Sequence, residues 1–253
     1  MLKSINVSNE ELKKITKRKF SKGSESNTYI IDIDGKMHVI KIFKKAENIP
    51  NKIKKIILMK DRLRKCDFVI QPETILKSEG NNIGYIMPKV NGKVFNMLNY
   101  SITECIYILK DLSTKLKRLH KMGIVAADFH HNFMIDEFGK IKLIDSDNFA
   151  IDDLYVDIEN IYLQKYKKNI HQFDKRFDNY LVNLFTLSCL TRTYCPFLYQ
   201  LFKNNPNKLY FKDEEINNIV FNTFNLNKQY NEDLIIDKIQ SKKDFKKIKQ
   251  KLF

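Results

Sequence analysis

The sequence lacks the features that mark several common classes of protein. No window approaches about 18 uninterrupted apolar residues, the length that a helix needs to cross a bilayer. The opening stretch MLKSINVSNEELKK has no apolar core of a secretory signal. The 4 cysteines include no CxxC pair and are scattered over Cys66, Cys105, Cys189 and Cys195. We therefore expect no membrane-spanning helix, no secretory signal and no zinc finger, and we expect reduced thiols in a cytoplasmic protein.

Glycine and proline are also scarce, with 7 and 5 residues among 253, and the chain has neither a low-complexity linker nor an internal repeat. It does have 43% hydrophobic and 12% aromatic residues, which is enough to build a core and argues against global disorder. Its length suits one large domain or two small lobes.

The net charge is +15, from 45 basic and 30 acidic residues. Such a charge favours nucleic acid, an anionic membrane surface or a phosphorylated ligand as a partner, or it reflects a solvated, lysine-rich surface. The basic residues are spread along the chain with no single basic arm, which favours the solvated surface. Nucleic acid is kept as the less favoured partner.

The first part of the chain has the pattern of an antiparallel sheet with helices. Apolar spacing predicts helices over residues 9–18, capped by Ser8 or Asn9, and over residues 51–64. Asp34-Gly35 is a strong hairpin signal between two of the predicted strands. Together the strands span residues 27–33, 37–43, 68–76 and 83–87, with a turn at 79–82.

The rest of the chain is mainly helical. Residues 101–122 carry apolar side chains at steps of three and four, which predicts a long amphipathic helix that Gly123 ends. Two short strands, 132–136 and 140–144, follow, and then helices over 153–166, 177–191, 214–222 and 243–252. This order predicts an α+β protein with a β-rich lobe over residues 1–88 and a helical lobe over residues 89–253.

One motif carries most of the functional information. The stretch ADFHHNFMID, residues 127–136, follows LHKMGIV (119–125) and precedes FGKIKLIDSD (138–147). Protein kinases have a long helix ending in L-H-x-x-G-I-V, then H-R-D-x-x-x-x-N, a strand pair and D-F-G. The chain resembles this family, in its bacterial or phage Ser/Thr kinase-like form, over most of its length. The resemblance implies a bilobal protein kinase-like fold.

The resemblance also implies the chemistry. Asp128 matches the catalytic acid that takes the proton of the hydroxyl substrate, and Asn132 and Asp145 match the oxygen ligands of Mg²⁺. Lys41, in the strand VIKIF (39–43), matches the lysine that binds the phosphates of ATP. Because Ile40 and Ile42 flank Lys41 on a strand, its side chain faces opposite to both.

Further positions match the nucleotide contacts of the family. Gly23, in KGSESNTY (22–29), is what remains of a glycine-rich loop over ATP, and a plain hairpin turn is the alternative. MPKVNG (87–92) resembles the hinge, with Met87 as gatekeeper, the C=O of Pro88 and the N–H of Val90 facing adenine. The acid that pairs with Lys41 is expected to be Asp61 rather than Glu47.

The motif departs from the family at several positions. Three residues instead of four separate Asp128 from Asn132, and Ala126 and Ala127 replace the His-Arg pair. We therefore expect no switch driven by an activation-loop phosphate. Asp145-Ser146-Asp147 replaces D-F-G, so Asp147 either adds a carboxylate near the metal or, as we favour, caps the following turn. No A-P-E element follows before residue 178.

Two other elements have alternative interpretations. RFDNYLVNLFTLSCL (176–190) resembles the helix whose buried acid holds the catalytic loop, which gives Asp178 a structural role, with a helix cap as the alternative. His130 and His131 either bind metal, face the γ-phosphate or pack in the loop; adjacent side chains diverge and no ligand partner lies at metal spacing, which disfavours metal.

These residues predict an ATP- and Mg²⁺-dependent kinase, a transferase that moves the γ-phosphate to a hydroxyl. A protein Ser/Thr is the first expected acceptor, and a small molecule, as in aminoglycoside phosphotransferases, is the second. The alternative from another class is a pseudokinase, a nucleotide-binding scaffold whose shortened loop transfers no phosphate.

Overall fold

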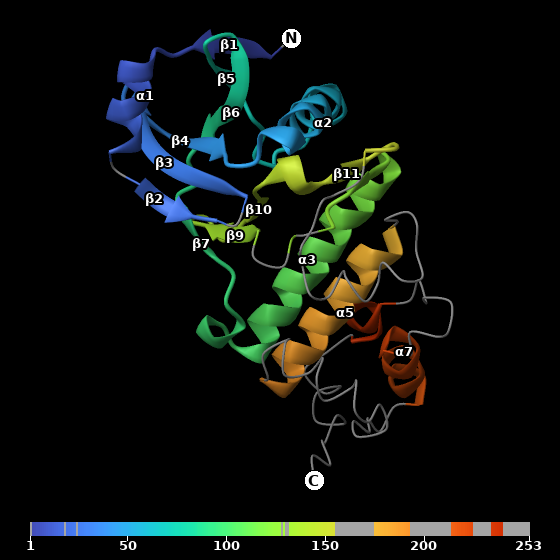
Figure 1. The fold of residues 1–253 in the computed structure, drawn as a ribbon. Coiled ribbons are helices and arrows are strands. Elements are labelled where there is room, and N and C mark those ends of the chain that lie inside the picture. Colours follow the sequence, from blue (N-terminus) through green and yellow to red (C-terminus); the bar gives the residue numbers. More distant parts are fainter. Residues whose placement is uncertain are drawn as a thin grey trace. The chain divides into compact units, whose positions relative to one another are not determined.

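The computed structural model describes residues 2–17, 19–23, 25–127, 129, 132–154, 175–192, 214–224 and 234–239. The chain is mixed α+β, with a β-rich sheet in the N-terminal part and helices later (Figure 1). It forms two compact units. The first comprises Met1–Val94 and His131–Val156, and the second comprises Phe95–His130 and Asp157–Phe253.

The first unit is built on a six-stranded sheet with the order β1-β5-β6-β4-β3-β2. All neighbouring strands are antiparallel except β1 and β5, which are parallel. The strands are β1 (Lys3–Asn6), β2 (Lys19–Lys22), β3 (Ser26–Ile33), β4 (Lys36–Phe43), β5 (Thr74–Ser78) and β6 (Asn81–Pro88). The predicted hairpin joins β3 to β4 through Asp34 and Gly35, whose φ angles are 52° and 74°.

Three of the sheet's strands differ from the prediction, and one of them, β2, was not predicted. The expected strand over 68–76 begins only at Thr74, because Pro72 has no N–H for a ladder, and Val69 instead forms an isolated bridge to Leu143. Strand β1 was not predicted, since its four residues are all exposed and show no alternation.

Helices α1 (Asn9–Thr16) and α2 (Ile49–Arg62) both belong to this unit. Ser8 caps α1 in a capping box with Glu11, as Ser8 was expected to do. The two helices contribute to different core clusters. Ile53 and Ile56 of α2 are buried in a cluster with Val39, Phe43, Ile75, Tyr85 and Met87. Leu12 and Ile15 of α1 pack against a second cluster of Val7, Tyr29, Ile40, Leu76 and Ile86.

The alternation of strand β4 between these clusters fixes the direction of Lys41. Val39 and Phe43 belong to the cluster that contains α2, whereas Ile40 belongs to the cluster that α1 covers. Lys41 therefore points to the same side of the sheet as Val39 and Phe43, away from Ile40.

A second sheet completes the first unit. It has the order β10-β9-β7 and consists of β7 (Gly92–Val94), β9 (Phe133–Asp136) and β10 (Ile141–Leu143). The predicted strand pair is thus β9 and β10, while β7 was not predicted. The N–H of Leu143 donates to the carbonyl of Phe68 at 2.7 Å, and the N–H of Ile70 donates to that of Leu143 at 2.9 Å. These two bonds attach β10 to the segment that precedes β5.

Short elements connect these strands and helices. In the first unit they are the 3₁₀ helices η1 (Ala46–Asn48) and η3 (Ser146–Asn148) and the short strand β11 (Ala150–Ile151). In the second unit they are η2 (Met97–Asn99) and the short strand β8 (Ile124–Val125).

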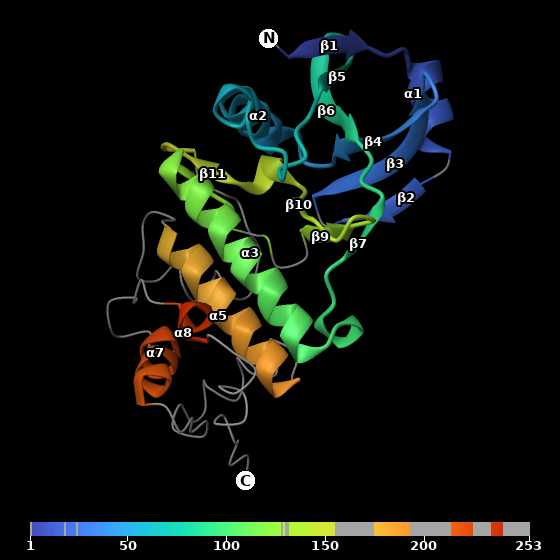
Figure 2. The same ribbon diagram turned by 180° about the vertical axis from the view of Figure 1, so that it is seen from behind.

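The described part of the second unit is mainly helical. It contains α3 (Ile102–Lys121), α5 (Lys175–Thr191), α7 (Glu214–Phe224) and α8 (Ile235–Lys238). Helices α3 and α5 lie side by side in both views (Figures 1 and 2). The predicted helix over 243–252 and nearly all of that over 153–166 lie outside the described residues. Among the described helices, none is long and apolar enough to cross a membrane.

Three of the cysteines, Cys66, Cys105 and Cys189, are buried, while Cys195 lies outside the described residues.

Candidate active site

The strand pair of the first unit brings Asn132 and Asp145 to neighbouring positions. Phe133 lies opposite Leu143 in the β9–β10 register, and the N–H of Ile144 donates to the carbonyl of Asn132 at 2.8 Å. Asp145 follows in a left-handed conformation, with φ 58° and ψ 43°. The side chain of Asp145 is 25% exposed. The hairpin therefore presents the two residues that were expected to bind a metal from adjacent backbone positions.

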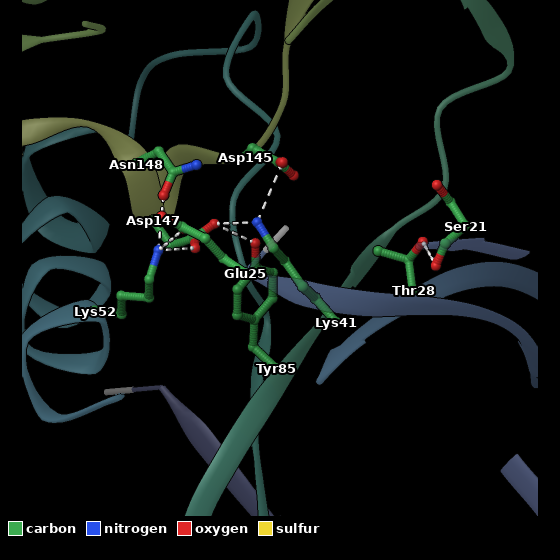
Figure 3. A network of polar contacts seen from close by, with 9 residues as sticks. All are labelled: Ser21, Glu25, Thr28, Lys41, Lys52, Tyr85, Asp145, Asp147 and Asn148. Carbon is green, nitrogen blue, oxygen red and sulfur yellow. Dashed lines mark hydrogen bonds and ion pairs between the residues drawn. The ribbon is translucent and has the colours of Figure 1, made fainter. Parts of the chain in front are cut away.

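Lys41 lies on β4 and is buried at 2% exposure. Its Nζ is 3.2 Å from Oδ2 of Asp145 and 2.9 Å from Oδ1 of Asp147 (Figure 3). Burial lowers the pKa of Lys41, but the attraction of Asp147 and Asp145 outweighs it and raises the pKa above its ordinary value. Lys41 is therefore a charged ammonium group inside the protein.

Asp147 is the carboxylate on which these contacts converge. It is fully buried, and its Oδ1 also accepts a hydrogen bond from the hydroxyl of Tyr85 at 2.7 Å. Its Oδ2 lies 3.1 Å from Nζ of Lys52. Burial raises the pKa of Asp147, but the charges of Lys41 and Lys52 outweigh it, so the net shift is well below the usual range. Burial and the two nearby carboxylates raise the pKa of Tyr85, which keeps its hydroxyl a neutral donor.

Lys52 reaches this cluster from α2 and is itself buried at 5% exposure. Its Nζ contacts Oε2 of Glu25 at 2.7 Å and Oδ1 of Asn148 at 2.7 Å, in addition to Asp147 (Figure 3). Glu25 lies between β2 and β3, in the segment that was expected to cover the phosphates of ATP. One ammonium group thus links the helix, that loop and the turn after β10.

The prediction that Asp61, rather than Glu47, pairs with Lys41 was wrong. Asp61 and Glu47 are both exposed, and the carboxylates that contact Lys41 are those of Asp145 and Asp147. The position of α2 that faces the cluster carries a lysine, Lys52, instead of an acid.

The favoured role of Asp147 as a turn cap was also wrong. Asp147 lies inside η3, and its carboxylate pairs with two lysines rather than with backbone N–H groups. Two features of the sequence agree with this cluster. The segment of α2 contains no glutamate, and Asp145-Ser146-Asp147 contains one acid more than the D-F-G motif that it replaces.

The residues that were predicted to contact the nucleotide all belong to the first unit. The N–H of Gly23 donates to the carbonyl of Ser26 at 2.9 Å, and its own carbonyl accepts from Nζ of Lys44. Met87 is buried in the core cluster beside α2, and Pro88 ends β6 opposite His38. The N–H of Val90 has no acceptor among the described residues.

The second unit holds the backbone that leads to Asp128. Oδ2 of buried Asp178 accepts from the N–H of Ala126 at 3.0 Å, and Oδ1 accepts from that of Ala127 at 2.8 Å. Nε2 of His120 lies 2.8 Å from Oδ2 of Asp178. Ala127 has a φ of 54°, so these bonds hold a conformation that alanine rarely adopts. The structural role of Asp178 is confirmed, while Asp128, His130 and His131 lie outside the described residues.

The chemistry of the donors suits a small, hard cation. Among the described residues, Oδ1 of Asp145 takes part in no hydrogen bond or ion pair, and the backbone of Asn132 is bonded to Ile144, the residue before Asp145. Mg²⁺ prefers such oxygen ligands and keeps several waters. In the described part of the chain, no group of three or more His, Cys, Asp or Glu side chains is arranged to hold a metal.

Comparison with known proteins agrees with a kinase relationship. No protein-family model matches the chain. Protein kinase YegI of Escherichia coli O157:H7 and of Escherichia coli strain K12 are each 31% identical to it over 100 residues. The match covers 34% of this chain and spans 16% and 15% of the length of these two relatives. The likeness supports a distant, family-level relationship to protein kinases over a third of the chain.

Proposed function

We propose that the chain is an ATP-dependent phosphotransferase of the bilobal protein kinase-like fold that transfers the γ-phosphate to a hydroxyl, with a protein serine or threonine as the first acceptor. The observation that carries the proposal is the convergence, in one unit, of the buried cation of Lys41 with the carboxylate of Asp145 beside Asn132. The likeness to protein kinase YegI supports the same reaction class.

In this proposal Lys41 binds the α- and β-phosphates of ATP. Its ammonium group has three N–H bonds, and Asp145 and Asp147 accept two of them, which leaves one for a phosphate oxygen. Asn132 and Asp145 hold Mg²⁺, which neutralises charge on the phosphates when it is bound.

Asp128 is the proposed base. It accepts the proton of the acceptor hydroxyl, the hydroxyl oxygen forms a bond to the γ-phosphorus, and the bond from that phosphorus to the bridging oxygen breaks to release ADP. The bonds from Asp178 to the two preceding residues, Ala126 and Ala127, support this role because they hold the backbone that carries Asp128.

The adenine is proposed to bind beside the end of β6. Val90 supports this assignment because its N–H has no acceptor among the described residues, and Pro88 needs to contribute only a carbonyl. The loop at Gly23 is proposed to cover the phosphates, and the chain is proposed to consist of a β-rich lobe over residues 1–88 and a helical lobe over residues 89–253.

A nucleotide-binding pseudokinase is the second candidate. The loop between Asp128 and Asn132 is one residue shorter than in the family, and the His-Arg pair is replaced by two alanines. A small-molecule acceptor is the third, because no A-P-E element marks a peptide-binding segment.

Transfer of labelled γ-phosphate tests the proposal. We expect the wild type to label a generic Ser/Thr protein substrate or itself. Asp128→Asn should reduce the rate by about 100-fold or more, since a positioned base contributes about 10²–10⁴. Asp145→Asn should also reduce the rate, because it removes the charge of a proposed Mg²⁺ ligand. Asp153→Asn is the matched control, because Asp153 is exposed. Binding of ATP without transfer to protein, metabolite or solvent would favour the pseudokinase.

A further inference from the structure

Two lysines of the first unit share one buried carboxylate. Lys41 comes from the sheet and Lys52 from α2, and both are almost completely buried. A buried cation is stable only when a counter-charge compensates for its lost hydration. Asp147, at 0% exposure, contacts the first lysine through Oδ1 and the second through Oδ2. It is therefore the shared counter-charge of both.

The two ammonium groups differ in how many hydrogen bonds they have left. Each has three N–H bonds. Those of Lys52 are matched by Glu25, Asp147 and Asn148, at 2.7, 3.1 and 2.7 Å. Lys41 has two acceptors among the described residues, Asp145 and Asp147. Lys52 is thus saturated by the protein, whereas Lys41 keeps one donor for a ligand.

The orientation of Asp147 is held from several elements. Tyr85 of β6 donates to the same oxygen that contacts Lys41, and Lys52 of α2 takes the other oxygen. Lys52 in turn contacts Glu25 in the loop after β2. Figure 3 shows the side chains of Lys41 and Lys52 pointing toward Asp147 from different elements.

We propose that Asp147 is the positioning residue of Lys41, and that Lys52 holds Asp147 in place by binding both Asp147 and Glu25. The arrangement inverts the charges of the expected pair between strand lysine and helix acid: here the helix supplies a cation, and the turn after β10 supplies the acid. Asp147 fixes the direction of the Lys41 ammonium group, so its loss weakens the grip on phosphate and leaves the adenine contacts intact. The inference rests on the proposed function, in which Lys41 binds the phosphates of ATP.

Titration of the full chain with Mg-ATP and, separately, with adenosine tests the inference. The first variant, Asp147→Asn, removes the charge and keeps the shape. The second, Lys52→Met with Asp147→Asn, removes one cation and one anion together, so the net charge of the cluster stays the same. Asp61→Asn and Lys54→Met are the matched controls, because both residues are exposed on α2.

Both test variants are expected to bind ATP about tenfold more weakly than the wild type, the effect of losing about 1.4 kcal/mol. Adenosine binding is expected to stay within about twofold, and the two controls should bind both ligands as the wild type does. A purely structural role would not separate the two ligands, because a general loss of order weakens both.

The inference is overturned if the folded double variant keeps the wild-type ratio of ATP to adenosine affinity, even when Asp147→Asn alone fails to fold. The outcome differs from failure of the proposed function, in which the wild type itself binds no ATP and the inference falls with it.

Discussion

Replacing Asp178 with alanine is expected to destabilise the protein strongly. The side chain of Asp178 is fully buried and accepts hydrogen bonds from the N–H groups of Ala126 and Ala127, with His120 Nε2 at 2.8 Å. Alanine leaves the two backbone donors buried without an acceptor. Each such group costs about 1–3 kcal/mol, so the free energy of unfolding should fall by roughly 2–6 kcal/mol. That is a large part of the about 5–15 kcal/mol typical of a folded protein.

Urea denaturation measures this effect directly. Asparagine at position 178 keeps one oxygen, so Asp178→Asn is expected to cost about half as much as alanine. A loss of 3 kcal/mol should also lower the melting temperature by roughly 6–12 °C for a chain of this size. Asp153→Asn is the control and should change stability by less than about 0.5 kcal/mol. An Asp178→Ala protein within about 1 kcal/mol of the wild type would refute the reasoning.

Two further predictions concern the first unit. In Gly84→Ala the new Cβ would lie 2.0 Å from the carbonyl oxygen of Lys41, so β4 and β6 must separate. We expect the free energy of unfolding, measured by urea denaturation, to fall by about 1–3 kcal/mol. A fall of less than about 0.5 kcal/mol contradicts this prediction. The pKa of Asp147 is lowered by folding, so its stabilisation is complete above the unfolded-state value of about 3.9 and is lost as the pH falls toward the folded-state pKa. The stability difference between wild type and Asp147→Asn should therefore shrink between about pH 4 and pH 2, and a difference that grows on acidification contradicts the ion pairing.

Elements that depend on residues close together in the sequence were predicted correctly. The hairpin of β3 and β4 follows from Asp34-Gly35 between alternating residues, and α3 follows from apolar residues at steps of three and four. The interaction of Asp178 with the loop was predicted from the resemblance to kinases, since the motif places it in the helix after that loop.

The cluster around Asp147 could not be predicted in the same way. Lys52 and Asp147 are 95 positions apart, and in a chain with 45 basic residues a helical lysine reads as a surface residue. Their pairing follows from two facts that only the structure supplies: which face of α2 turns toward the sheet, and where the turn after β10 places its second acid. The absence of a helix glutamate was visible in the sequence, but the residue that replaced it was not.

The most direct test of the central claim is a titration of the wild type and of Asp145→Asn with ATP, each with and without Mg²⁺. Because Asp145 lies beside Asn132 and contacts Lys41, we predict that Mg²⁺ strengthens ATP binding to the wild type and that Asp145→Asn loses most of this gain. A wild type that binds no ATP, or a variant that keeps the full effect of Mg²⁺, would contradict the account.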